Sequence, residues 1–420
     1  MKAKPASTIW RNRQFHAYIA STGFSGFALA MQQLMLSWIL IGILLLPADQ
    51  VGLIQALIGI PGVFLMLLGG ASADRSDPRR LLIFAYLLAP IFPLFLIAMS
   101  GMDMFVVWTV VVWGLGISVV QALSLPAQQA ILNNVTGDHL QKGIAAATAI
   151  GFVVQVMGLS LAGQLELIGV NTILYLQAGA FVIAAATIGR LQLQPTSSTQ
   201  SVQNNLNTNA AQQIMEGLRA TVRHRVIAPV LLINFTSSIF NAGSFMTVFP
   251  YIVKRIYDGD AFMLAALMAL FFTGAFLSNV LLLRFMPLAR PGRVYLVAQL
   301  SRILVLLLMF FAPSFSVMVL ATFLWGLNMG MTTNLSRTIV QESSEAAYRG
   351  RILSVFTVSM IGSAPIGAIV LGFLIEAIGT LNALLPAVGV SLVLGLYGIF
   401  FSPIWRYRSP TVEPATAGAS

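Results

Sequence analysis

Long stretches without a charged residue are the feature that most limits how this chain can fold. Ten stretches without Asp, Glu, Lys or Arg cover residues 14–48, 50–73, 81–102, 104–137, 143–165, 167–189, 226–253, 261–283, 352–375 and 377–405. An eleventh, 294–336, is interrupted only by Arg302 and contains the turn sequence Ala312-Pro313-Ser314. About 20 apolar residues cross a bilayer as a helix. Splitting the eleventh stretch at the turn therefore predicts an all-α integral membrane protein with twelve transmembrane helices.

The composition excludes the soluble classes of protein. Of the 420 residues, 58% are hydrophobic and 9% are charged, whereas soluble domains carry about 45–50% apolar and about 25% charged residues. A soluble enzyme, a disordered protein and a nucleic-acid-binding domain are excluded. The chain has no cysteine, and no span contains a histidine pair, paired carboxylates or an H-E-x-x-H run. We therefore expect no catalytic residues, no metal site and no cofactor.

The basic residues predict the orientation of the spans. With both termini inside, the inner segments hold nineteen Lys and Arg residues, the outer loops hold only Lys254 and Arg255, and Arg302 and Arg337 lie within or at the edge of spans. Cytoplasmic loops of membrane proteins carry such an excess of positive charge. The net charge of +10 therefore reports topology, and we expect both termini to be cytoplasmic.

A polar segment divides the spans into two halves. The run PTSSTQSVQNNLNTNAAQQ is typical of a flexible linker. At its end Ile214, Leu218 and Val222 recur at helical spacing, which predicts a short interfacial helix. The predicted divisions are an N-terminal six-helix bundle, a cytoplasmic linker, a C-terminal six-helix bundle and a cytoplasmic tail, at 1–190, 191–224, 225–408 and 409–420.

Short motifs recur in the same order in both halves. The tripeptide Trp-Gly-Leu occurs at 113–115 in span four and at 325–327 in span ten. A glutamate between two glycines ends span five at 163–169 and span eleven at 372–379. This order predicts two pseudo-symmetric bundles, and repeated halves are the usual build of secondary transporters.

The loop between spans two and three carries a specific motif. Its sequence at 70–80, GASADRSDPRR, resembles the G-x-L-A-D-R-x-G-R-R motif of the major facilitator superfamily at the expected place in the chain. Asp77 stands where the motif usually has its second Gly, as in the branch of the bacterial enterobactin exporter. The stretches LPAQQA at 125–130, RGR at 349–351 and GSAPIG at 362–367 also resemble that branch. The resemblance covers residues 10–405.

The resemblance implies a monomeric secondary transporter of the bacterial inner membrane that alternates between inward-open and outward-open states. Members of that branch export siderophores, drugs or other small metabolites, so export of a small molecule is the predicted function. An importer of a small polar solute is the alternative. A channel or a non-transporting membrane sensor is a more remote one, because no filter motif is visible.

Polar side chains at helical spacing predict a substrate cavity. Span seven has Asn234 and Asn241 on one face, and Asn328 begins a stripe in span ten. Polar groups within a bilayer are costly and tend to face a cavity or another helix. In the resembling superfamily, spans one, four, seven and ten line the central cavity. The predicted cavity residues are Gln32, Gln33, Gln121, Asn234, Asn241 and Asn328.

Two questions about charge stay open in the sequence. Arg302 lies about 15 Å into span nine, counting 1.5 Å per residue, and no Asp or Glu lies at similar depth. It could bond helix carbonyls, bind an anionic substrate or lie nearer the cytoplasmic surface. His16, His139 and His224 lie at span ends or in loops. Protons as a coupling ion would therefore act through Asp74 or Glu376, with uniport as the alternative.

The motif loop also predicts a conformational gate. In the resembling superfamily its aspartate docks on the cytoplasmic end of span eleven when the inner side is closed. A helix N-terminus stabilises a carboxylate, because it carries free N–H groups and partial positive charge. The predicted gate consists of Gly70, Asp74, Arg75, Arg79 and Arg80 in the loop and of Arg349 and Arg351 at span eleven.

The predicted topology is testable with single cysteines in this cysteine-free chain. In intact cells, a membrane-impermeant maleimide should label Asp258→Cys in an outer loop and spare Ser201→Cys in the linker, because only the former faces outward. Permeabilised cells should allow labelling of both, which controls for reactivity. Labelling of Ser201→Cys alone from outside would reverse the orientation.

Overall fold

The computed structural model describes residues 12–73, 77–136, 139–191, 210–311, 314–345 and 348–410. Within these ranges every regular element is a helix, and twelve helices are long and apolar enough to cross a membrane. They cover Arg13–Ile43, Ala48–Leu65, Pro78–Ser100, Val107–Thr136, Lys142–Ala162, Val170–Gly189, Ile227–Arg255, Ala261–Phe285, Pro291–Phe310, Phe315–Ser343, Arg349–Ile378 and Asn382–Phe401. The predicted all-α membrane fold with twelve spans is confirmed.

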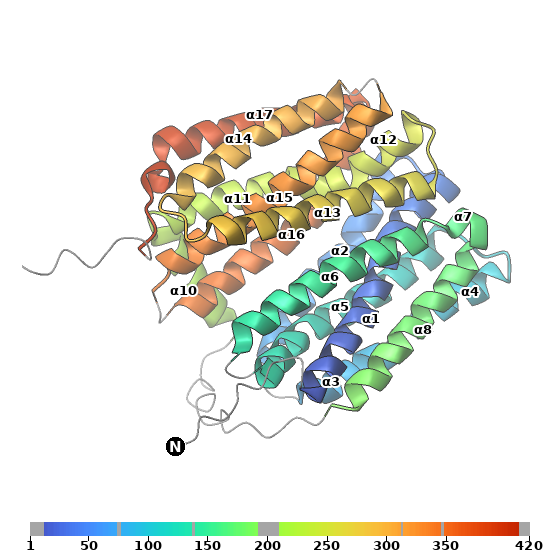
Figure 1. Ribbon diagram of the computed structural model, residues 1–420. Helices are drawn as coiled ribbons and strands as arrows, with labels where there is room; N and C mark the ends of the chain where they lie inside the picture. Colours follow the sequence, from blue (N-terminus) through green and yellow to red (C-terminus); the bar gives the residue numbers. More distant parts are fainter. Residues whose placement is uncertain are drawn as a thin grey trace, which may run out of the picture. The chain divides into compact units, whose positions relative to one another are not determined.

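The chain forms two compact units (Figure 1). Unit 1 comprises Met1–Leu46, Leu57–Thr208 and Gly259–Ala269, and unit 2 comprises Pro47–Ala56, Asn209–Asp258 and Leu270–Ser420. Two helices contribute to both. The first residues of α2, up to Ala56, belong to unit 2, and the first residues of α13, up to Ala269, belong to unit 1. Neither unit is therefore a continuous half of the chain.

In unit 1, helix α1 lies between α6 and α8 and also contacts α5 (Figure 1). The proline Pro90 separates α3 from α4 within the third span, because proline has no N–H group to continue the helical ladder. The charge-free stretch 81–102 predicted one span there and did not indicate the break. The elements are α1 (Arg13–Trp38), η2 (Ile39–Ile43), α2 (Ala48–Ala73), α3 (Pro78–Leu88), α4 (Ile91–Ser100), α5 (Val107–Thr136), α6 (Leu140–Ala162), α7 (Leu165–Ile168) and α8 (Val170–Gly189).

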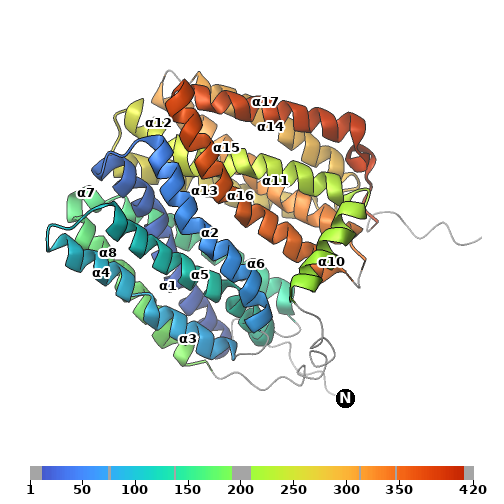
Figure 2. The same cartoon turned by 180° about the vertical axis from the view of Figure 1, so that it is seen from behind.

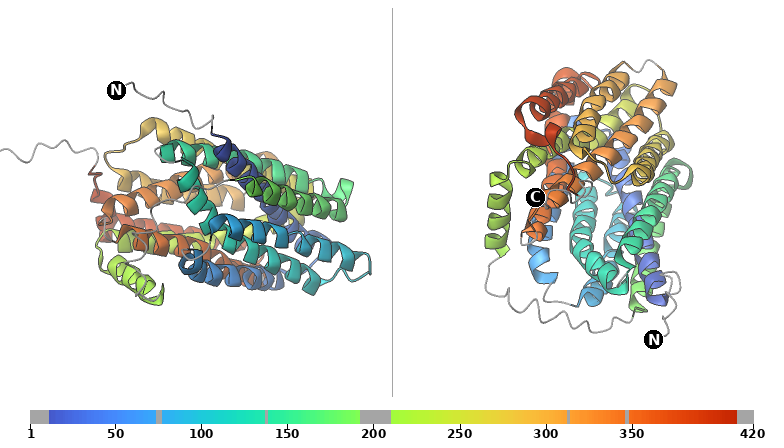
Figure 3. Two further views of the ribbon diagram at one scale, coloured as in Figure 1. Left: turned by 90° about the horizontal axis from the view of Figure 1, so that it is seen from below. Right: turned by 60° about the vertical axis from the view of Figure 1, so that its left-hand side comes forward.

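In unit 2, α11 packs on α16, and α14 packs on α15 and α17 (Figures 2 and 3). Helix α10 lies across the ends of α11 and α16 (Figure 2). Its residues include the segment for which the spacing predicted a short interfacial helix. The elements are α10 (Ala210–Arg223), α11 (Ile227–Gly243), η5 (Ser244–Val248), α12 (Phe249–Arg255), α13 (Ala261–Phe285), α14 (Pro291–Phe310), α15 (Phe315–Ser343), α16 (Arg349–Ile378), η6 (Asn382–Leu384), α17 (Leu385–Leu396), η7 (Tyr397–Phe401) and η8 (Pro403–Arg406).

The repeated Trp-Gly-Leu motif packs on the second span of its half in both units. Trp113 and Trp325 are each fully buried. A Cβ atom placed on Gly114 would lie 2.6 Å from Ile58 Cδ1 of α2, and one placed on Gly326 would overlap the carbonyl oxygen of Phe271 in α13. Span four therefore packs on span two as span ten packs on span eight, which is the relation that the pseudo-symmetric repeat predicts.

The close approach at Gly326 gives a stability prediction. Gly326→Ala should lower the free energy of unfolding by about 1–3 kcal/mol, because the new methyl group meets backbone atoms that cannot turn away. Gly179→Ala, on α8 with nothing within 4 Å of the new atom, should be neutral or stabilise by up to about 1 kcal/mol. Thermal unfolding of the detergent-solubilised proteins measures both. Equal melting temperatures would contradict the packing of α13 on α15.

Candidate functional site

In unit 1 the predicted cavity amides have three different environments. Gln155 Nε2 of α6 donates to Gln33 Oε1 of α1 at 2.8 Å. Gln32 is 8% exposed, and its Oε1 atom accepts no hydrogen bond within the described part of the chain. Gln121 on α5 is exposed. The structure therefore joins Gln33 to Gln155, and a substrate contact by Gln32 or Gln121 stays a prediction.

A buried amide that sequence reasoning missed holds three helices of unit 1 together. Gln177 on α8 is fully buried. Its Oε1 accepts from Trp113 Nε1 of α5 at 3.1 Å, and its Nε2 donates to the Ala28 carbonyl oxygen of α1 at 3.2 Å. The amide of Gln177 near the middle of the apolar sixth span was the available signal, since a polar group in a bilayer needs a partner. Gln177 therefore has a structural role in this unit.

In unit 2 the charge of Arg302 is buried between α14 and α15. The side chain is 5% exposed. Its Nε donates to Asn328 Oδ1 at 3.2 Å and its Nη2 to Thr332 Oγ1 at 3.4 Å, both on α15. Neither partner is a helix carbonyl, which was one of the three environments that the sequence left open for Arg302, and the other two stay open. A side-chain amide and a hydroxyl, one helical turn apart, accept from the guanidinium.

Asn328 uses both ends of its amide in this cluster. Besides accepting from Arg302, it donates through Nδ2 to the Ala298 carbonyl oxygen at 2.5 Å and to Ser301 Oγ at 3.0 Å. It is 6% exposed. The predicted polar stripe of span ten therefore meets span nine in this structure, and a substrate contact by Asn328 stays a prediction.

The two predicted amides of span seven differ in their partners. Asn241 Oδ1 accepts from Trp325 Nε1 at 2.6 Å, and the Trp325 ring is surrounded by aromatic rings of Phe245, Phe249 and Phe271. Asn234 is 5% exposed, and its Nδ2 donates no hydrogen bond within the described ranges. The Trp325 bond fixes the orientation of the Asn241 amide. Asn234 presents a buried donor that another group could accept.

The predicted gate is described only in part. Asp74 and Arg75 lie outside the described residues, as does the side chain environment of position 70. Arg79 Nη2 donates to the Gly189 carbonyl oxygen at 2.5 Å, which ties α3 to α8, whereas Arg80 is exposed and lies 3.6 Å from Asp77. At the start of α16, Arg349 donates to the Ser344 carbonyl oxygen at 3.3 Å, and the Arg351 guanidinium lies 5.8 Å from the centre of the Tyr348 ring. The gate stays a prediction.

Comparisons with known proteins agree with this fold. The model of the transmembrane secretion effector family matches residues 6–415. The crystal structure of nucleoside transporter NupG superposes with a TM-score of 0.74 at 14% identity, covering 94% of this chain and 99% of that chain. A POT family transporter in complex with 5-aminolevulinic acid gives a TM-score of 0.69 at 12% identity, with 93% and 96% covered. At these identities the structures show the fold alone. No curated protein sequence matches the chain.

The Arg302 cluster gives a prediction about stability. Asn328→Leu should destabilise by about 1–3 kcal/mol or more, because it leaves a buried charged donor without its acceptor. Arg302→Met should cost less, since it removes the buried charge together with the donor. The double variant should be more stable than Asn328→Leu, because an apolar replacement of both partners can be nearly neutral.

Thermal unfolding of the single and double variants completes this cycle. Asn382→Leu is the matched control, because Asn382 is exposed and its side chain donates to a carbonyl oxygen four residues earlier, that of Ile378 at the end of α16. Additive effects of the two substitutions would show that Arg302 and Asn328 do not depend on each other.

Proposed function

We propose that this chain, which belongs to the transmembrane secretion effector family of the major facilitator superfamily, exports a small molecule by alternating access. The observation that carries the proposal is the family match over residues 6–415, because the family's description names secretion, which is transport out of the cell. The twelve spans support a multi-pass membrane transporter. We place it in the bacterial inner membrane as a monomer with both termini in the cytoplasm, in accord with the positive-inside bias.

The substrate that fits the candidate residues is polar and either uncharged or zwitterionic. Gln32, Gln121, Asn234 and Asn241 are neutral amides, and each amide supplies two donors and one acceptor. Such groups orient a polar ligand without a counter-ion. A siderophore, a drug or another small metabolite meets this description. NupG is named as a nucleoside transporter, and the other structure is of a POT family transporter. Their likeness to this chain concerns the fold and does not indicate its substrate.

Turnover requires a gate on the cytoplasmic side, and we assign it to the loop after span two. Asp74, with Gly70, Arg75, Arg79 and Arg80, would dock on the start of α16 near Arg349 and Arg351. A carboxylate at that helix N-terminus is stabilised by the free N–H groups of the first turn. Coupling to protons would act through carboxylates at the span ends, and uniport is the alternative.

Metabolite profiling of cells with the gene deleted and then restored tests the direction and the substrate together. A compound that accumulates in the deletion strain and returns to the medium on restoration is the expected result for an exporter. Uptake of a compound from the medium only by the restored strain would make the carrier an importer. Profiles that are the same in both strains for every compound would count against carriage of a metabolite.

Once the compound is known, Asn241→Leu and Gln121→Leu test the candidate site. Loss of one amide hydrogen bond should raise the KM of transport by about two- to twelvefold, since such a bond contributes about 0.5–1.5 kcal/mol. Initial rates in inverted vesicles measure it. Asn382→Leu, at the outer start of span twelve, controls for a general effect of the substitution. An unchanged KM in both variants would remove these residues from the site.

A further inference from the structure

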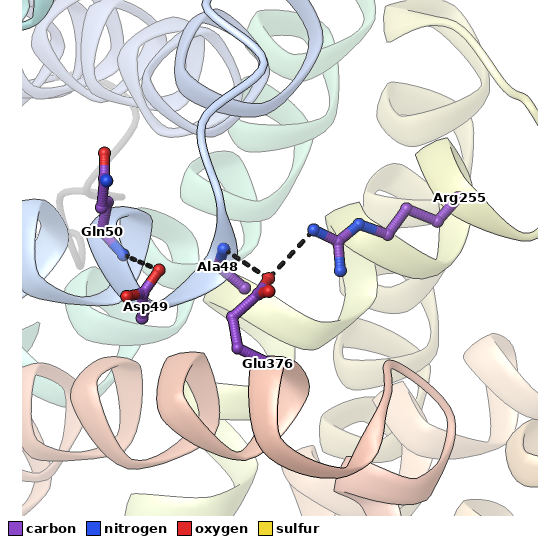
Figure 4. Close-up of polar contacts among 5 residues, drawn as sticks. All are labelled: Ala48, Asp49, Gln50, Arg255 and Glu376. Atoms are coloured by element: carbon purple, nitrogen blue, oxygen red, sulfur yellow. Dashed lines mark hydrogen bonds and ion pairs between the residues drawn. The ribbon is translucent and has the colours of Figure 1, made fainter.

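At the end of α16, one carboxylate receives two donors from other helices of unit 2. The backbone N–H of Ala48, the first residue of α2, donates to Glu376 Oε1 at 2.9 Å (Figure 4). Arg255, the last residue of α12, donates to the same oxygen through Nη2 at 3.0 Å. Ala48 is fully buried, and the charged side chains of Arg255 and Glu376 are 39% and 37% exposed. Glu376 therefore holds the first turn of α2.

Unit 1 contains a second carboxylate with the same arrangement. Glu166 of α7 accepts from the backbone N–H of Ala261, the first residue of α13, at 3.3 Å. The same oxygen, Oε1, accepts from Trp38 Nε1 at 3.0 Å, and Trp38 is the last residue of α1. Glu166 therefore holds the first turn of α13 as Glu376 holds that of α2.

The two arrangements correspond to each other in the repeat. Glu376 lies in the last turn of the fifth span of its half, and Glu166 lies just after the corresponding span. Each accepts from the start of the second span of the other half. Each also accepts from a side chain near the end of the first span of its own half. Three residues after each glutamate stands a glycine in the left-handed region, Gly169 with φ 86° and Gly379 with φ 91°. A correspondence of this kind is not expected from an isolated surface contact.

Glycines bring the helices into backbone contact beside each glutamate. A Cβ atom on Gly372 would lie 2.5 Å from the Ala48 carbonyl oxygen, and one on Gly163 would lie 2.5 Å from Ala265 Cβ. The carboxylates therefore act where the helices can approach closely enough for a bond to a backbone N–H. The N–H groups of a first helical turn have no partner within their own helix, and they favour a negative charge.

Each of these helix starts also has an acidic residue of its own. Asp49 accepts from the Gln50 N–H at 2.8 Å, and Asp260 accepts from the Met263 N–H at 2.8 Å. Within the described ranges, the hydrogen bonds of these aspartates go to the first turns of their own helices, and Figure 4 shows the bond between Asp49 and Gln50. Asp49 and Asp260 are therefore matched controls for Glu376 and Glu166, because they carry the same charge near the same helix start.

We propose that Glu166 and Glu376 are paired latches of the outer side of the carrier. The inference rests on the proposed function, since alternating access moves the two units relative to each other. Helices α2 and α13 each begin in one unit and continue in the other. Such a movement pulls on their first turns, and the outer side opens only when each glutamate releases its backbone N–H.

The latches differ in their second donor, and this difference predicts unequal strength. Arg255 adds an ion pair to the Glu376 latch, whereas Trp38 adds a neutral donor to the Glu166 latch. Exposed ion pairs contribute modestly and are screened by salt. The Glu376 latch should therefore be the stronger one at low ionic strength, and only its strength should fall appreciably as salt is added.

Distances between spin labels in the full-length protein in lipid nanodiscs, without substrate, test the latches. The cysteine-free chain accepts one labelled pair per latch at exposed positions. Gln50→Cys with Ile378→Cys reports on α2 and α16, and Leu167→Cys with Phe262→Cys reports on α7 and α13. Pulsed electron paramagnetic resonance gives the ratio of the long-distance to the short-distance population for each pair.

Glu376→Gln should raise this ratio roughly tenfold at its pair, because glutamine keeps an acceptor but loses the charge that strengthens both bonds. Glu166→Gln should raise the ratio at its own pair by a smaller factor. Asp49→Asn and Asp260→Asn should leave both ratios unchanged. Ratios that do not respond to either glutamate, or that respond equally to the aspartate controls, overturn the proposal.

A further variant decides the matter if a glutamate variant does not fold. Arg255→Gln keeps the bond between Glu376 and Ala48 and should raise the ratio at the α2 pair by about two- to fivefold at low salt. This increase should be smaller in 1 M salt. An unchanged ratio at low salt would overturn the Glu376 latch. Because no substrate is used, failure of the latches is distinguishable from failure of export, which the metabolite profiles measure.

Discussion

The absence of water from the hydrocarbon region of the bilayer is the constraint on which the rest of this structure depends. Every polar group there must find its partner within the protein, because an unpaired one costs several kcal/mol. Helices satisfy the backbone, and a few side chains satisfy one another. Gln177 accepts from a tryptophan N–H and donates to a carbonyl oxygen. Arg302 donates to a side-chain amide oxygen and to a hydroxyl oxygen of α15. These bonds join facing helices within each unit.

The same constraint explains which parts of the fold could be predicted. Charge-free stretches located all twelve spans, because lipid excludes charges from helix centres. The first stretch, 14–48, was longer than its span, which ends at Ile43 before a turn with Leu45 at φ 52°. The break at Pro90 was missed because proline alone does not end a membrane helix. Pro126 and Pro365 lie inside α5 and α16.

The site was less predictable, because spacing identifies a face of a helix and not what that face meets. Asn328 and Thr332 do share one face of α15, yet that face meets Arg302 of α14. Gln33 was predicted as a cavity amide, and its acceptor is used by Gln155 from a different span. The bond from Ala48 to Glu376 joins residues 328 positions apart, and no local pattern encodes such a pairing. The sequence indicated only that the two glutamates are equivalent, through the matching glycines around each of them.

The shared helices also bear on how the protein is made. A ribosome delivers the chain from its N-terminus, yet unit 1 contains Gly259–Ala269, which are synthesised after the entire linker and the seventh span. The first six spans thus enter the membrane before one part of their own unit exists. Until that part arrives, Glu166 lacks the Ala261 N–H, and the small surface around Gly163 lacks Ala265. These contacts of the N-terminal half therefore form only after the first part of the C-terminal half has been synthesised.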